Sequence, residues 1–174
     1  MGWTFSRSFT KASIRAERTA PYQDAFDRGS TTTTLRSTYK GNTLWTLHET
    51  TTATGEMQRW IGCTRVSRQD GQWGYKDMSE HMGPYYFDCP LDYLDAATEP
   101  PNETASEWRE QVRRHHAQKK LQAAKKPQVG ETWSVVGSPT VPRISVVDTK
   151  PLIGTYNGTL YRVKQRMLGE RIYG

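Results

Sequence analysis

One long helical segment with β-type sequence on both sides limits what this chain of 174 residues can fold into. Residues 102–126 begin with two helix-capping candidates, Asn102 and Thr104, and Pro127 cannot continue a helix. Glutamates occupy the early turns and lysines the late turns, an order that complements the helix dipole. Since extended runs precede and follow this helix, the sequence predicts an α+β fold.

The part before this helix reads as an antiparallel β-meander. Residues 31–69 are rich in β-branched and aromatic residues, and the tripeptide "KGN" at 40–42 is typical of a hairpin turn. Asp70-Gly71 marks a further turn. We therefore expect about three antiparallel strands, preceded by a helix in residues 11–28 that Pro21 ends or kinks.

The part after the helix changes character. Four short β-like runs are separated by turn residues, and Asn157-Gly158 is the strongest hairpin signal in the chain. Short strands at this spacing favour a small β-barrel of SH3-like type. The expected domains are an α+β meander with two helices, the second of them the basic helix, over residues 1–126, and a barrel-like domain over 127–174.

Charge is unevenly distributed along the chain, which carries a net charge of +6. Residues 65–100 hold three basic and seven acidic side chains, whereas residues 101–126 hold seven and three. An acidic centre beside a basic segment favours charge-steered recognition over uniform binding to a polyanion.

The cysteine count and the hydropathy pattern bear on the compartment. Cys63 and Cys89 are too few for a disulfide framework, and their spacing matches no zinc motif, which favours reduced thiols in a cytoplasmic protein. The first residues lack the apolar core of a signal peptide, and no apolar run approaches the ~20 residues of a membrane span.

The densest group of reactive side chains lies in "GYKDMSEHMGPYYFDCP", residues 74–90. Asp77, Glu80, His81 and Cys89 are the candidates for catalysis, as an acid–base pair or as a cysteine with a histidine base. The chain has no phosphate-binding glycine loop, nucleophile elbow or zinc-binding histidine motif. We therefore expect no cofactor and no metal, and catalysis is the least favoured interpretation.

Two other interpretations of this segment remain open. It serves as a turn-rich element that fixes the fold, with Lys76 paired to Asp77 or Glu80, or as a recognition loop. Amphipathic aromatic residues are enriched at protein interfaces. The partner-binding candidates are Trp73, Tyr75, Lys76, Tyr85 and Tyr86.

The long helix supplies a second candidate surface, which would contact nucleic acid or an acidic protein. Its cations spread over several sides of an ideal helix, so they do not form a single face that would fit into a nucleic-acid groove. A solvated helix face is the alternative interpretation. The candidates are Arg109, Arg113, Arg114, Lys119, Lys120, Lys125 and Lys126.

Three stretches carry a resemblance to a known group of proteins: the opening Met1 to Phe5, the segment from Gly74 to Pro90, and the terminal "GTLYRVK". They resemble a little-characterised family of small proteins of phages, plasmids and other mobile elements. Its members show Met-Gly-Trp-Thr-Phe and a Gly-Tyr-Lys-Asp-Met-x-Glu-x-x-Gly-Pro core followed by Asp-Cys-Pro. The resemblance implies a setting in the cytoplasm of a bacterial host, and no particular reaction.

Three functions follow as hypotheses. The first is a non-enzymatic binding protein, of the anti-CRISPR or anti-restriction type, that inhibits a host defence by covering a host protein or nucleoprotein complex. The second is a nucleic-acid-binding accessory protein for replication or transfer. The third is a small enzyme centred on Asp77, Glu80, His81 and Cys89.

Overall fold

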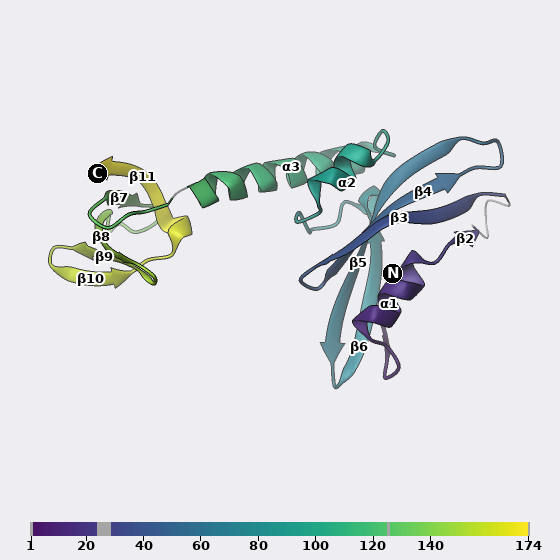
Figure 1. Cartoon of the computed structure of the whole chain (residues 1–174), viewed down its shortest axis with the longest axis horizontal. Helices are drawn as coiled ribbons and strands as arrows, with labels where there is room; N and C mark the ends of the chain where they lie inside the picture. The colour runs from purple at the N-terminus through teal and green to yellow at the C-terminus, as the bar shows by residue number, and fades with distance from the viewer. Residues whose placement is uncertain (1, 24–28, 125, 174) are drawn as a thin grey trace. The chain divides into compact units, whose positions relative to one another are not determined.

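A computed structural model describes residues 2–23, 29–124 and 126–173 of the chain (Figure 1). The α+β class expected from the sequence is confirmed, with strands in two antiparallel sheets. The chain divides into two compact units, unit 1 (residues 1–116) and unit 2 (residues 117–174). Unit 1 ends at His116, inside the long helix, whereas the boundary expected from the sequence followed residue 126.

Unit 1 contains a six-stranded sheet in the order β1-β6-β5-β4-β3-β2. Every adjacent pair of strands is antiparallel, and β3 to β6 form the expected meander with one strand more than predicted. The strands are β1 (Thr4–Ser6), β2 (Tyr22–Gln23), β3 (Thr31–Lys40), β4 (Thr43–Thr51), β5 (Met57–Gln69) and β6 (Gln72–Ser79).

Strand β6 corrects one expectation. We expected residues 74–79 to form a loop or a helical turn. They instead pair with β5 in register, with Thr64 opposite Asp77. The β5–β6 hairpin is closed by Asp70 and Gly71 at φ 50° and 76°, the left-handed conformation that this turn type requires. Only residues 80–82 are helical, as a single 3-10 turn.

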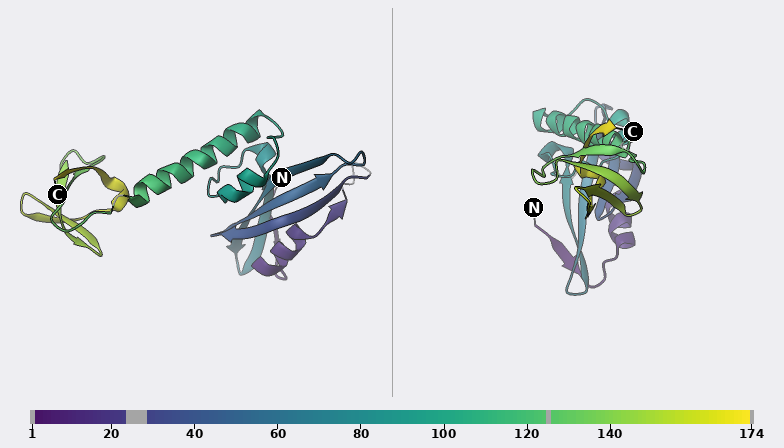
Figure 2. Two further views of the ribbon diagram at one scale, coloured as in Figure 1. Left: turned by 45° about the horizontal axis from the view of Figure 1, so that its top comes forward. Right: turned by 90° about the vertical axis from the view of Figure 1, so that its left-hand side faces the viewer.

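The helices of unit 1 cover both faces of its sheet (Figure 2, left). Helix α1 (Lys11–Thr19) begins at a capping box between Thr10 and Ser13 and ends before Pro21. It packs on one face, where Ile14 is buried. Helix α2 (Leu91–Ala96) and the part of α3 (Glu103–Ala124) that belongs to unit 1 cover the other face. The sequence predicted two helices in this domain, and α2 forms where residues 91–101 indicated a single helical turn.

The main core of unit 1 lies between the sheet and the helices α2 and α3. Asn102 caps α3, since its Oδ1 accepts a hydrogen bond from Ala105 N at 2.8 Å. Trp108 of α3 lies against Trp45 of β4, with ring centroids 5.8 Å apart. The buried cluster is Trp45, Leu47, Ile61, Cys63, Cys89, Tyr93, Leu94, Trp108 and Val112.

Unit 2 contains the end of α3 and a five-stranded antiparallel sheet in the order β10-β9-β8-β7-β11. Asn157 and Gly158, at φ 50° and 77°, form the predicted hairpin turn between β9 and β10. The fifth strand was not expected from the sequence. The strands are β7 (Thr132–Val135), β8 (Arg143–Thr149), β9 (Leu152–Tyr156), β10 (Thr159–Arg162) and β11 (Leu168–Tyr173).

Unit 2 has an apolar core that includes Trp133, Ile144 and Leu168, and a buried carboxylate links its strands. Glu131 Oε2 accepts hydrogen bonds from Gln128 N and Trp133 Nε1, each at 2.9 Å. Its Oε1 accepts from Arg171 Nη1 at 2.9 Å, joining β11 to the start of β7. The backbone hydrogen bond from Gln128, followed by the bonds from Arg171 and Trp133, lowers the pKa of this carboxyl.

Candidate functional site

Glu80, a predicted catalytic candidate, is part of the fold rather than of a reactive centre. Its carboxylate is fully buried and accepts a hydrogen bond from Ile61 N at 2.8 Å. Arg109 of α3 binds it through two nitrogens, with Nε to Oε2 at 2.6 Å and Nη2 to Oε1 at 3.0 Å. Arg109 Nη1 also donates to the Thr98 carbonyl at 2.6 Å. This bidentate pair fixes α3 onto the sheet.

The same pair corrects two expectations. Arg109 was predicted to lie on an exposed basic surface, but it is 5% exposed and fully engaged with Glu80 and Thr98. The ion partner of Glu80 is therefore Arg109, and not Lys76 as the segment's sequence indicated. The signal for this pairing is a spacing of 29 residues between a strand end and a helix, which no local pattern reveals.

Asp77 lies on the opposite face of the sheet from Glu80. Its Oδ1 accepts a hydrogen bond from Thr64 Oγ1 at 2.7 Å, and its Oδ2 pairs with Arg18 Nη1 of α1 at 2.6 Å. Arg18 also pairs with Glu17 and lies 4.7 Å from the centre of the Tyr75 ring. Asp77 and Glu80 therefore do not form a carboxylate pair, since each is bound to a different helix.

Both thiols are buried in unit 1. Cys89 is 0% exposed and Cys63 is 1% exposed, and both belong to the core between the sheet and α3. Burial raises the pKa of the Cys63 thiol to about 12, and it also raises the pKa of Cys89. A thiol held in its protonated form is a poor nucleophile. The predicted pairing of Cys89 with His81 is not formed; His81 lies near Ser79 Oγ and the edge of Trp60.

Replacing Cys89 by Ser tests this assignment. The serine hydroxyl would be buried among apolar side chains, so we expect the free energy of unfolding to fall by about 1–3 kcal/mol. Urea unfolding followed by tryptophan fluorescence measures this loss. If Cys89 were a catalytic nucleophile on a surface, the variant would instead unfold like the wild type.

The five predicted partner-binding residues differ in how exposed their side chains are. Trp73, Tyr75 and Tyr86 are half-buried, and the ring of each lies close to a Lys or Arg side chain of unit 1. Lys76 is also half-buried. Tyr85 is 92% exposed, on the loop between the 3-10 turn and α2. Of the five candidates, Tyr85 is therefore the side chain most available for contact.

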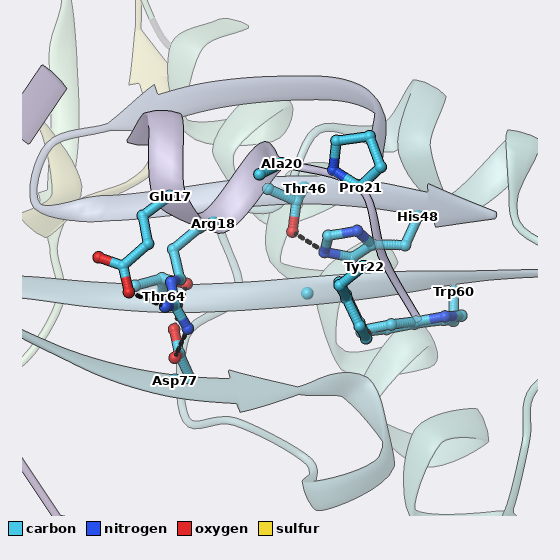
Figure 3. Close-up of a pocket in the computed structure, with 11 residues that line it drawn as sticks. Glu17, Arg18, Ala20, Pro21, Tyr22, Thr46, His48, Trp60, Thr64 and Asp77 are labelled. Atoms are coloured by element: carbon cyan, nitrogen blue, oxygen red, sulfur yellow. Dashed lines mark hydrogen bonds and ion pairs between the residues drawn. The ribbon is translucent and has the colours of Figure 1, made fainter. Parts of the chain in front are cut away.

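A pocket that the sequence did not reveal lies between the end of α1 and the sheet of unit 1 (Figure 3). It has a volume of about 370 Å³. Its charged end holds Glu17, Arg18 and Asp77 with Thr64, and its other end holds the rings of Tyr22, His48 and Trp60. Ala20, Pro21, Thr46 and Gly62 also line it.

His48 is held neutral inside this pocket. Its Nε2 lies 2.7 Å from Thr46 Oγ1, and its Nδ1 lies 3.1 Å from Thr34 Oγ1. The ring packs on Trp60 at a centroid separation of 4.4 Å. Burial lowers the pKa of His48 to about 4, so the imidazole carries no charge at neutral pH.

A glycine makes room for this histidine. A Cβ atom at Gly62 would lie 2.4 Å from Thr46 Oγ1 and 2.8 Å from His48 Nε2, closer than side chains approach each other. Strand β5 can therefore cross beneath the Thr46–His48 hydrogen bond only because position 62 has no side chain. The alternation of Thr46 and His48 along β4 was the available sequence signal, since it places two polar side chains on one buried face.

His48 and Asp77 in this pocket are both engaged in internal hydrogen bonds. Both ring nitrogens of His48 have hydroxyl partners, and Asp77 is bound by Arg18 and Thr64. A general base must be free to reach a substrate proton. Among the described residues, no group of three or more His, Cys, Asp or Glu side chains is placed to hold a metal ion.

The remaining basic candidates are exposed on α3 and just beyond it. Arg113 and Arg114 lie within unit 1, and Arg114 pairs with Glu110 at 3.1 Å on the helix surface. Lys119, Lys120 and Lys126 lie within unit 2 and are exposed. Lys125 lies outside the described residues.

The net charge of the chain resides in unit 2. Residues 117–174 contain ten Lys or Arg and three Asp or Glu, a net charge of +7. Residues 1–116 contain fourteen and fifteen, a net charge of −1. The two values add up to the +6 of the whole chain. Electrostatic attraction to an anionic partner is therefore a property of unit 2.

Comparisons of this chain with protein-family models, with curated proteins and with solved structures give no match. In the part of the chain that the structure describes, no helix is both long enough and apolar enough to cross a membrane.

Proposed function

We propose that this protein is a non-enzymatic binding protein of a phage or other mobile element, and that it inhibits a host defence by covering a protein or nucleoprotein complex. The proposal rests on the contacts that the reactive side chains of residues 74–90 make. Glu80, Asp77 and Cys89 are all committed to internal contacts, whereas Tyr85 is left exposed.

The mechanism is steric. An exposed tyrosine offers a large contact area at a small cost in conformational entropy, and aromatic side chains are frequent among interface hot spots. The loop that carries Tyr85 is fixed at both ends, because Trp108 Nε1 donates to the Tyr86 carbonyl at 3.1 Å and Pro84 is buried. A rigid loop binds a partner surface without a large ordering cost. Capture of the partner by wild type and by Tyr85→Ala tests this mechanism.

The five-stranded sheet of unit 2 supports a further structural proposal, a small barrel of SH3-like type. Five short antiparallel strands enclose one apolar core, and a 3-10 turn at 165–167 leads into the last of them. The cytoplasm of the bacterial host is the proposed location, since both cysteines are buried free thiols.

A nucleic-acid-binding accessory protein is the second candidate function, and the net charge of +7 on unit 2 favours it. The exposed cations Lys119 and Lys120 are its predicted phosphate contacts.

Electrophoretic mobility at low salt tests this candidate. We expect wild type to retard duplex or single-stranded nucleic acid with an affinity that falls steeply as salt rises. The double variant Lys119→Glu, Lys120→Glu should abolish retardation, because each change replaces an attraction by a repulsion. Glu103→Lys with Glu107→Lys, on the same helix, is the control of opposite charge. Absence of any retardation by wild type at low salt would exclude direct nucleic-acid binding.

A further inference from the structure

The outward face of the unit 2 sheet carries a row of small hydroxyl side chains that ends in an exposed tyrosine. Tyr173 on β11 lies opposite Thr132 on β7, which lies opposite Ser145 on β8, which lies opposite Thr155 on β9. Directly opposed residues of antiparallel strands share one face of a sheet. The four side chains therefore form one continuous row across four strands.

This row lies on the face away from the core. The neighbouring positions Trp133 and Ile144 point into the apolar cluster, and side chains alternate between faces along each strand. In the middle of the row, Thr132 Oγ1 and Ser145 Oγ are hydrogen-bonded at 3.0 Å. Tyr173 at its end is 67% exposed.

The row forms the floor of a trough with a volume of about 340 Å³. Asn157 of the hairpin turn and the cationic side chain of Arg143 also line it. No carboxylate is among the described residues that line it. Its volume falls in the range of about 300–1,000 Å³ that is typical of small-molecule sites.

We propose that this trough binds a single-stranded polynucleotide, with a base stacked on Tyr173 and a phosphate bound by Arg143. Proteins that bind single strands combine cationic side chains with aromatic platforms, and this trough places the cation Arg143 and the ring of Tyr173 in one lining, within a unit of net charge +7. Thr132, Thr155 and Asn157 supply hydrogen-bonding groups beside the base. A duplex hides its base faces, so a stacking platform of this kind selects an unpaired strand.

The inference rests on the second candidate function, direct nucleic-acid binding, and assigns it a site. It is independent of the loop around Tyr85, which belongs to unit 1.

Fluorescence anisotropy of labelled oligo-thymidine and oligo-uridine of about 20 nucleotides, titrated with the full chain at about 50 mM salt, tests the inference. We expect Tyr173→Ala to weaken binding about tenfold, and Tyr173→Phe, which keeps the ring, to stay within about threefold. Arg143→Gln should weaken binding and reduce the slope of log K against log salt by about 0.7. The DNA and RNA arms show which strand the hydroxyl row prefers.

Two controls separate the trough from general electrostatics. Lys150→Gln removes the same charge from the β8–β9 turn, at the opposite end of β9 from Asn157, and should change affinity by less than about twofold. Tyr85→Ala removes an exposed tyrosine from unit 1 and should leave binding unchanged. Circular dichroism and thermal unfolding confirm that each unit 2 variant is folded.

The possible failures are distinguishable. If wild type binds with a steep salt dependence but Tyr173→Ala and Arg143→Gln bind equally well, the trough is not the site, and the accessory function stands without it. If wild type binds neither oligonucleotide at low salt, the trough and the accessory function both fail. In either case the proposed inhibition through the Tyr85 loop is unaffected.

Discussion

Replacing Glu80 by Gln should lower the free energy of unfolding of unit 1 by about 3–5 kcal/mol. The amide keeps the size of the carboxylate but removes its charge, so Arg109, which is 5% exposed, is left as a buried cation without a counterion. The hydrogen bond to Ile61 N can persist, and the loss therefore reports the ion pair. Urea unfolding followed by tryptophan fluorescence measures it.

A matched control is available on the same helix. Glu110 and Arg114 form an ion pair at 3.1 Å whose side chains are 61% and 75% exposed, and Glu110→Gln should cost no more than about 0.5 kcal/mol. The double variant Glu80→Leu, Arg109→Met, which leaves no unpaired charge, should be more stable than Glu80→Gln. A Glu80→Gln variant as stable as wild type would show that the pair does not hold α3 on the sheet.

Acid should destabilise unit 1 through His48. Burial lowers the pKa of the folded-state imidazole to about 4, whereas an unfolded histidine has its ordinary pKa of about 6.5. Between these two pH values, His48 is protonated in the unfolded chain but stays neutral in the folded chain. The contribution is therefore fully present above pH 6.5 and is lost as the pH falls to about 4, for a total of about 3 kcal/mol.

The His48→Gln variant isolates this effect, because all other titrating groups are shared with wild type. The stability difference between wild type and His48→Gln should shrink by about 3 kcal/mol from pH 7 to pH 4. His81→Gln, which changes an exposed histidine, should follow the wild-type curve. Parallel curves for wild type and His48→Gln would contradict a buried neutral imidazole at this position.

The local features of the fold were predictable from sequence. The turns at Asp70-Gly71 and Asn157-Gly158 were found because residues at positive φ are nearly confined to Gly, Asn and Asp. The long helix was predicted from the capping candidate Asn102 and from the order of its glutamates and lysines, and Asn102 does cap it. Both signals come from residues that are close to one another in the sequence.

The candidate site was predictable only in part, because its contacts join distant segments. Strand β6 was missed since Asp77 looks like a loop residue until Arg18, 59 residues earlier, supplies its counterion. Arg109 looked like an exposed cation for the same reason, because its partner Glu80 lies on another element. The pocket around His48 combines α1 with four strands, so no single stretch of sequence shows it.

The most direct test of the proposed function is the capture of a partner from a lysate of the proposed bacterial host, quantified for wild type and for Tyr85→Ala. Tyr85 is 92% exposed, so its removal should leave the fold intact while removing the proposed anchor. Trp3→Ala, a change at another exposed aromatic side chain of unit 1, is the control. The account predicts one protein or nucleoprotein complex retained by wild type and by Trp3→Ala, and reduced at least about tenfold for Tyr85→Ala. No reproducible partner for wild type, or equal retention by Tyr85→Ala, would contradict it.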